Sequence, residues 1–333
     1  MRRLVPLALV VAACGSPSGD PDAAGPVDAP RPDGAAADAA MADAAMADAA
    51  TADARLVDAA APLDGGTYRS SLGVCWTDPG CPRALAVAHG GAWDALTTPY
   101  LSNAAIAAAY AGGIDGVKID VRITMDGVPV LAHSSPVEFY ESLDCAGRTI
   151  ETMTAAQVTA CHRLPSSTET FQRLDAVLDY LRGKLVAQLT VKRAVDYAGV
   201  IAAVHAAHAE DFAFFEIDPG DIATLPSLPG AGTVWFMVNA ASSLPVVDQV
   251  INAANPRIFM VEFDPTLAIG DVVATRLHPH GVRGFTYDDS TTATVAQLAA
   301  HYGRGLDVVS SQTTPNVVMA RQQVNTARGV SPP

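Results

Sequence analysis

"GIDGVKIDVRITMDGVPVLAH", residues 113–133, is the stretch of the chain that decides the expected fold. A run of β-branched residues, 116–121, leads into a tight turn at 124–127, and a second short run ends at His133. Successive side chains of a strand point to opposite faces, so Lys118 and Asp120 share one face while Val117, Ile119 and Val121 share the other. We therefore predict a buried strand, a hairpin turn and a second strand that delivers a histidine.

Seven further runs of the same kind occur along the chain, at 84–90, 184–192, 212–218, 233–240, 257–264, 281–289 and 306–311. Helical patterns lie between them, at 102–112, 170–182, 196–209, 243–253, 291–302 and 315–325. Strand and helix alternating over this length predict an α/β fold of the (β/α)8 TIM-barrel type. A doubly wound open sheet is the alternative; it is disfavoured because no glycine-rich phosphate turn follows the first strand.

Most of these runs finish in a polar residue, and in a barrel such ends converge on the rim that carries the chemistry. Asp and Asn commonly begin loops, which explains Asp218, Asn239, Asp264 and Asp288 without any function. His89, His133 and Lys192 are not turn formers. We therefore treat these three, together with Asp120, as candidate catalytic residues.

The first residues predict export. "MRRLVPLALVVAAC" has two arginines, a short apolar run and small residues before Cys14, the pattern of a secretory signal with a bacterial lipobox. We predict a signal peptide at 1–13, lipidation of Cys14, a disordered Ala/Asp-rich linker at 14–66 and the barrel at 67–333. This organisation implies a lipoprotein anchored to the bacterial cell envelope, in the outer membrane, with the membrane reached through the anchor alone. An ordinary signal peptide with an incidental cysteine is the alternative.

The acidic charge of the chain lies mostly in that linker. Residues 15–66 contain ten Asp and two Arg, a net charge of −8 out of −14 for the whole chain. The remaining part is only mildly acidic, so the low pI says little about its ligand. No basic stripe is present to neutralise a phosphate backbone, which argues against nucleic acid as a partner.

Four cysteines remain once Cys14 is assigned to lipid. An even number of cysteines in an exported domain indicates disulfide bonds, and four allow three connectivities. We favour Cys75 with Cys81 and Cys145 with Cys161, because each pair closes a short local loop.

Two histidines, a carboxylate and lysines are what phosphodiester cleavage requires. One imidazole removes a proton from the nucleophile and the other delivers a proton to the leaving alkoxide, while cations stabilise the charge on the phosphoryl oxygens. His89 and His133 fit the first two roles, and Lys118 and Lys192 fit the phosphate-binding role.

The chain resembles the glycerophosphodiester phosphodiesterase family from about residue 84 to 320. The first similarity is between "AHGG" at 88–91 and the family's "HRG" motif. The second covers residues 98–135, which align without gaps with the family segment that contains "PENT", "E-x-D-V" and "T-x-D-G". The third is between "AQLTVK" at 187–192 and the family's "E-x-K" strand. The resemblance implies a barrel that hydrolyses glycerophosphodiesters to an alcohol and glycerol 3-phosphate, usually with Ca²⁺ or Mg²⁺. It implies catalytic roles for His89 and His133, a metal carboxylate at Asp120 and a phosphate-site lysine at Lys192.

The departures from the family pattern concern the metal. Tyr100, Lys118 and Thr190 stand where the family has glutamates, and Gly90 replaces the arginine of "HRG". One aspartate leaves a hard cation with too few anionic ligands, and the Lys118 ammonium can reach the place of the metal.

Three hypotheses follow. The first is a metal-independent phosphodiesterase in which Lys118 stands in for the cation. The second is a degenerate barrel that binds a phosphorylated or polyol ligand without turnover. The third is a metal-dependent enzyme with ligands relocated to other strand ends; the candidates are Glu216, Asp218, Glu262 and Asp264.

Overall fold

The computed structural model describes residues 69–330 except 242–243, 254 and 256. The predicted signal peptide, Cys14 and the linker at 14–66 lie outside the described residues. All described elements belong to one compact unit, residues 53–333. None of the described helices is long and apolar enough to cross a membrane.

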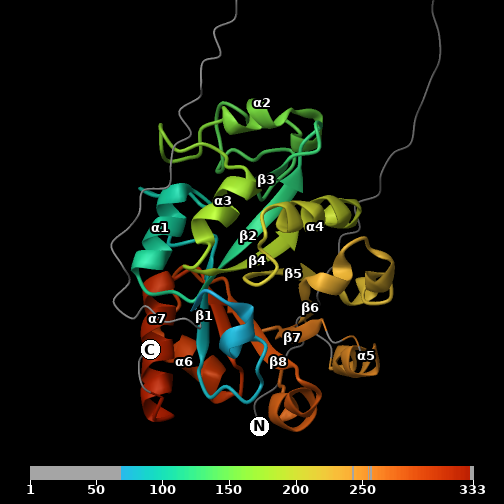
Figure 1. Cartoon of the computed structure of the whole chain (residues 1–333). Helices are drawn as coiled ribbons and strands as arrows, with labels where there is room; N and C mark the ends of the chain where they lie inside the picture. The colour runs from blue at the N-terminus through green and yellow to red at the C-terminus, as the bar shows by residue number, and fades with distance from the viewer. Residues whose placement is uncertain (1–68, 242–243, 254, 256, 331–333) are drawn as a thin grey trace, which may run out of the picture. The chain divides into compact units, whose positions relative to one another are not determined.

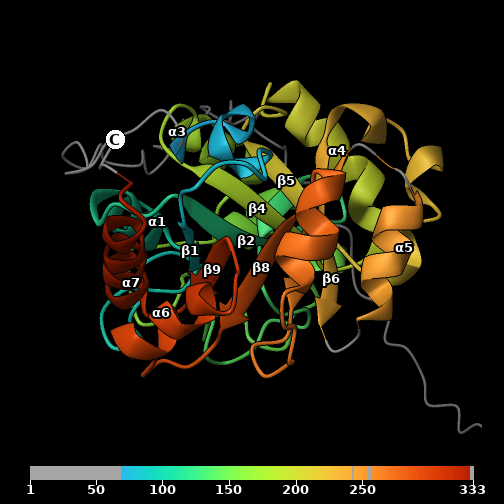
Figure 2. The ribbon, with the colours of Figure 1, turned by 90° about the horizontal axis from the view of Figure 1, so that it is seen from below.

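Eight parallel strands of the described chain close into a barrel, which confirms the predicted fold (Figures 1 and 2). Around the barrel they run β1, β9, β8, β7, β6, β5, β4, β2, and β1 pairs with β2 to close the circle. Their bounds are β1 Leu85–His89, β2 Gly116–Ile123, β4 Val186–Val191, β5 Ala213–Ile217, β6 Trp235–Ala241, β7 Ile258–Phe263, β8 Arg283–Asp288 and β9 Val308–Ser311. The short β3, Pro129–Leu131, runs antiparallel to β2, as the hairpin predicts.

Helices cover the outside of the barrel. They are α1 Asn103–Ala111, α3 Leu174–Leu181, α4 Tyr197–Ala206, α5 Pro245–Ala253, α6 Val295–Gly303 and α7 Thr314–Ala327. Each of the six predicted helical segments overlaps one of them. Between β7 and β8, where no helix is predicted, the connection has only the short turns Val273–Leu277 and His278–His280.

The side chains of β2 point alternately toward the surrounding helices and into the barrel. Val117, Ile119 and Val121 belong to the large core packed under the helices. Lys118 and Asp120, on the other face, therefore point into the barrel. Below them the interior is apolar, and Trp76, from the turn Leu72–Trp76, fills it against strand residues such as Phe214 and Phe259.

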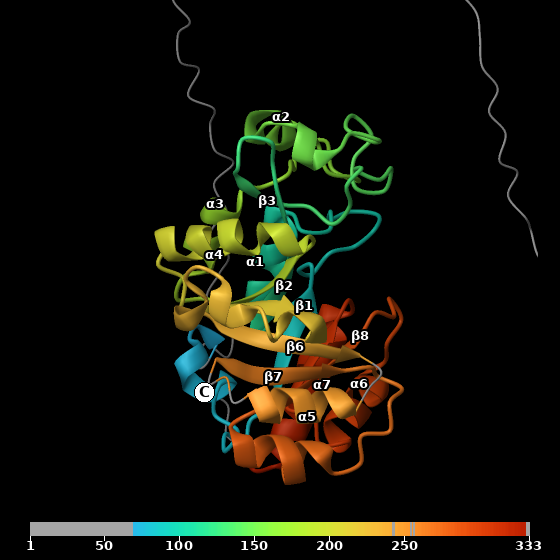
Figure 3. The ribbon, with the colours of Figure 1, turned by 90° about the vertical axis from the view of Figure 1, so that its right-hand side faces the viewer.

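An insertion between β3 and α3, residues 134–170, extends beyond the barrel and carries α2, Ala155–Thr159 (Figures 1 and 3). It has a small core of its own, which includes Val137, Ile150 and Met153. A disulfide bond joins Cys145 to Cys161 inside it, and a second joins Cys75 to Cys81. The structure thus confirms the predicted pairing of the four cysteines.

Candidate active site

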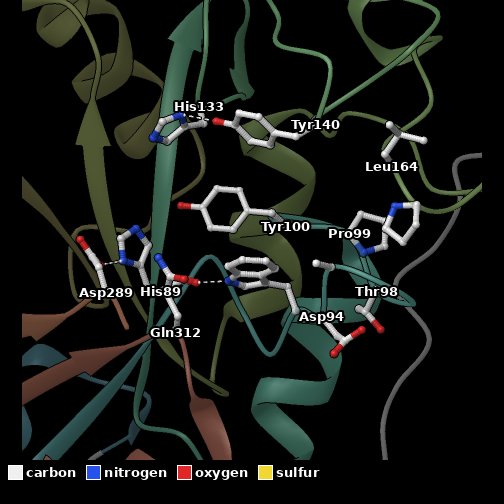
Figure 4. A pocket seen from close by; sticks show the side chains of 13 residues that line it. His89, Asp94, Thr98, Pro99, Tyr100, His133, Tyr140, Leu164, Asp289 and Gln312 are labelled. Atoms are coloured by element: carbon white, nitrogen blue, oxygen red, sulfur yellow. Dashed lines mark hydrogen bonds and ion pairs between the residues drawn. The ribbon is translucent and has the colours of Figure 1, made fainter. Parts of the chain in front are cut away.

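His89 ends β1 and is held by a residue that follows β8, two strands further round the barrel. Its Nδ1 lies 2.8 Å from Oδ1 of Asp289, which follows β8 (Figure 4). The hydrogen bond from His89 lowers the pKa of Asp289. A carboxylate at Nδ1 fixes the tautomer and the orientation of the imidazole, so that Nε2 is the nitrogen available for proton transfer.

His133 follows β3 and is positioned by the insertion. Oε1 of Glu141 accepts the backbone N–H of His133 at 3.0 Å, and Oε2 accepts that of Ser134 at 2.9 Å. Nδ1 of His133 lies 3.0 Å from the Tyr140 hydroxyl. Burial lowers the pKa of His133 below its ordinary value, so this imidazole is neutral at neutral pH.

Tyr100 stands between the two histidines. Its ring centroid is 6.0 Å from that of His89 and 6.1 Å from that of His133, and Figure 4 shows it between them in the cavity. The Tyr100 hydroxyl donates to Oδ2 of Asp120 at 2.6 Å. Burial, followed by the neighbouring Asp120, raises the pKa of Tyr100 well above its usual value, so the hydroxyl remains a donor.

Gly90 makes room for that tyrosine. It has a φ of +75°, and a Cβ built on it would lie 1.8 Å from Cε2 of Tyr100. Any larger residue at position 90 would therefore displace the Tyr100 ring. Two of the departures from the family pattern, at positions 90 and 100, are sterically linked.

Asp120 lies at the centre of a buried ionic cluster. Its Oδ1 accepts from Lys118 Nζ at 2.9 Å and lies 2.7 Å from Lys192 Nζ, while Oδ2 accepts from Tyr100. Burial by itself would raise the pKa of Asp120, but Lys118 and Lys192 outweigh it and hold this pKa well below the usual range. Burial also disfavours the charged form of Lys118, but the negative charges of Asp120 and, to a smaller extent, Glu216 outweigh burial and raise the pKa of Lys118.

These residues do not fit a hard divalent cation. Both Asp120 oxygens are taken by donors, and two ammonium groups lie within 3 Å of the carboxylate. Glu216 instead accepts from Thr190 Oγ1 at 2.7 Å and Gln188 Nε2 at 3.0 Å. Burial, followed by the charge of Glu216, raises the pKa of Glu262 well above its usual value, which favours the uncharged acid. Among the described residues no group of three or more His, Cys, Asp or Glu side chains could hold a metal ion.

Two other polar residues at predicted strand ends bind the backbone of the loop that follows each of them. Asp264 Oδ1 accepts from the backbone of Thr266 at 2.7 Å, and Asp288 Oδ1 accepts from that of Ser290 at 3.0 Å. Both contacts are the local turn bonds expected of aspartate, which confirms the interpretation of these two residues as loop initiators.

A cavity of about 600 Å³ opens in front of the two histidines. Its walls include His89, His133, Trp93, Tyr100, Tyr140 and Asp289 (Figure 4). Lys118 and Lys192 are not among the lining residues, and neither is any arginine. Phosphate binding by the two lysines therefore stays a prediction.

Sequence reasoning missed Asp289, Tyr140 and Glu141. Asp289 is adjacent to Asp288, so the paired carboxylates after β8 were a usable signal. Tyr140 and Glu141 lie in the insertion, where no periodic pattern predicts which side chains turn toward the barrel.

The fold and the site together define a class: a (β/α)8 barrel with two histidines facing one cavity at the carboxyl ends of its strands. Residues 99–198 match the sequence profile of the Glycerophosphoryl diester phosphodiesterase family. The match is confined to this segment, which carries β2, β3, the insertion, α3 and β4, and in it the chain is similar to that family.

Curated relatives match over part of their length. Glycerophosphodiester phosphodiesterase 1 of Mus musculus is 37% identical over 124 residues, which cover 35% of this chain and 36% of that protein. The Homo sapiens protein of the same name is 39% identical over 87 residues, 25% of each chain. The chain thus spans about a third or less of these relatives.

Solved structures share the fold. A glycerophosphoryl diester phosphodiesterase from Parabacteroides distasonis superposes with a TM-score of 0.63 at 17% identity, covering 75% of this chain and 90% of that one. A phosphodiesterase from Oleispira antarctica, solved with the product sn-glycerol-3-phosphate, gives a TM-score of 0.55 at 16% identity, covering 72% and 96%.

Proposed function

We propose that the chain is a phosphoric diester hydrolase that cleaves glycerophosphodiesters without a metal ion. One observation carries the proposal: two histidines with different electrostatic surroundings face one cavity, beside a carboxylate that is neutralised by lysines. The match of residues 99–198 to the Glycerophosphoryl diester phosphodiesterase family and the product bound to the Oleispira antarctica protein support a glycerophosphodiester as substrate.

The surroundings of the two histidines suggest their roles. His133 is kept neutral by burial, so its Nε2 accepts the proton of the attacking water when Nδ1 donates to the Tyr140 hydroxyl. His89, whose Nδ1 is held by Asp289, gives its Nε2 proton to the leaving alkoxide. The P–O bond to the alcohol breaks, a P–O bond to water forms, and the two proton transfers balance.

The lysines supply the positive charge. Lys118 and the ionised Asp120, both within β2, and Lys192, directly after β4, together carry a formal net charge of +1. Lys192 is the more accessible of the two lysines, its side chain 20% exposed against 13% for Lys118. The phosphoryl oxygens therefore lie on the Lys192 side, while Lys118 holds Asp120 in place of a cation.

A second function, ligand binding without turnover, is favoured by one feature. Both lysines are already bound to Asp120, and the cavity walls contain neither lysine nor arginine. This alternative predicts that a phosphorylated or polyol ligand binds but is not consumed.

A hydrolysis assay decides between the two functions. The segment 53–333 is incubated with glycerophosphocholine or glycerophosphoethanolamine, and glycerol 3-phosphate is measured. The proposal predicts its release in step with the free alcohol. Saturable binding of glycerol 3-phosphate by calorimetry, with no product from either diester, would instead establish the binding protein.

The pKa of His133 predicts the acid limb of the pH profile. A general base must be neutral, so kcat/KM falls as pH drops through its pKa. Because burial lowers that pKa, we expect the limb to lie below the ordinary histidine value of about 6.5. Replacement of Tyr140 by alanine removes one wall of the cavity, exposes the imidazole and shifts the limb upward.

The control for this profile is Leu143→Ala, on the same segment but outside the cavity lining. It is expected to leave the acid limb of kcat/KM in place. An unchanged limb in Tyr140→Ala would mean that His133 is not the group that titrates.

A further inference from the structure

The exposed large apolar side chains are concentrated on one group of loops. Of the eight among the described residues, six lie in segments that follow strands β1 to β4: Leu96, Met125, Phe139, Tyr140, Leu143 and Val195. Only Val74 and Met319 lie elsewhere. Single exposed apolar residues are normal on a soluble surface, but such clustering marks an interaction site.

One of these side chains lines the cavity, and two more belong to residues next in sequence to lining residues. Tyr140 lines the cavity and is itself 54% exposed. Leu96, 84% exposed, directly follows the lining residue Ala95, and Phe139, 74% exposed, directly precedes Tyr140. We call Leu96, Phe139 and Tyr140 the apolar rim.

The chemistry of the rim indicates a lipid surface. It combines an aliphatic and two aromatic side chains at loop tips, and Trp93 lies just inside it, a mixture suited to the boundary between headgroups and acyl chains. The charged residues beside it, Asp94 and Glu138, are exposed carboxylates. A rim of this charge is repelled by anionic lipids, so the matching surface is zwitterionic.

Two more features support a membrane as the occupant. The rim is continuous with the cavity of the two histidines, and a phospholipid surface presents phosphodiesters at the depth of its headgroups. The sequence also predicts a lipid anchor at Cys14, and the 52 residues of 15–66 can span at most about 170–190 Å. That reach lets the barrel turn any of its faces toward the membrane.

We propose that, in addition to the anchor that the sequence predicts as the sole membrane attachment, the apolar rim inserts into the surface of a zwitterionic phospholipid membrane and places the cavity mouth among the headgroups. The proposal does not depend on turnover, because insertion needs only the rim.

Vesicle sedimentation tests the insertion. The segment 53–333 lacks the predicted anchor and contains all described strands, core clusters and both disulfide bonds. With sucrose-loaded phosphatidylcholine vesicles we expect it to sediment, and about 0.5 M salt should not release it, because salt screens charges and not apolar contacts. In the double variant Leu96→Ser/Phe139→Ser the lipid concentration for half-binding should rise at least about tenfold.

The matched control is Met319→Ser, an exposed apolar residue on α7, which should bind as the wild type does. Far-ultraviolet circular dichroism checks that all variants are folded. The proposal is overturned if the wild-type segment stays in the supernatant, if the double variant sediments equally well, or if binding requires anionic lipid.

Discussion

His89→Ala should lower kcat/KM for a glycerophosphodiester by about 10²–10⁴-fold while the fold persists. His89 is the histidine that Asp289 holds at 2.8 Å, and in the proposed mechanism the leaving alkoxide depends on its proton. Without the imidazole the alcohol must depart as an unprotonated alkoxide. His89 is only partly buried, so its removal leaves no large cavity in the core.

The control for this loss is His280→Ala, an exposed histidine in the turn before β8. It should retain wild-type kcat/KM. Hydrolysis by His89→Ala within a few-fold of wild type would remove this residue from the mechanism. A loss accompanied by unfolding in circular dichroism would be traced to structure, and His89→Gln, which keeps most of the volume, would then replace it as the test.

Asp120→Ala should lower the free energy of unfolding by about 3–5 kcal/mol. Asp120 has no solvent exposure, and its removal leaves the Lys118 ammonium inside the barrel without its nearest carboxylate. The measurement is urea unfolding at neutral pH. Since the pKa of folded Asp120 is lowered, its contribution is present above the ordinary carboxyl pKa of about 4 and is lost as pH falls below it.

Two further variants test whether the loss of stability comes from the unpaired Lys118 ammonium. Asp179→Ala, whose side chain is 85% exposed and 3.9 Å from Arg182, should change stability by less than about 1 kcal/mol. Lys118→Met added to Asp120→Ala should restore part of the loss, because it removes the unpaired charge. Equal instability of the double and single variants would show that the cost does not come from Lys118.

The barrel could be predicted because its strands are short apolar runs with a period of two and its helices lie between them. His89 and His133 could be predicted because histidine is not a loop former, so its place at a strand end needs another explanation. The disulfide partners followed from loop length. Each of these inferences uses only residues close together in the sequence.

The contacts across the barrel could not be predicted in the same way. Asp289 reaches His89 over 200 residues, and the two are brought together only when β1 and β8 take their places in the closed sheet. Tyr140 reaches His133 through an irregular insertion with its own disulfide bond. Such contacts depend on register and loop path, which a single sequence does not specify.

The structure shows which contacts the residues that depart from the family pattern make. Gly90 admits the ring of Tyr100, Tyr100 donates to Asp120, and Lys118 balances the charge of Asp120. Thr190 in turn donates to Glu216 on the neighbouring strand. Two of the residues that replace glutamates, Tyr100 and Lys118, thus bind the remaining aspartate directly, while the third binds Glu216.

The central claim is that this arrangement performs phosphodiester hydrolysis in place of a metal ion. Its most direct test is the rate of glycerol 3-phosphate release from glycerophosphocholine after exhaustive treatment with a chelator, with and without added Ca²⁺ or Mg²⁺. We predict the same rate in all conditions for the wild type. A rate that the chelator abolishes and the cation restores would contradict the claim.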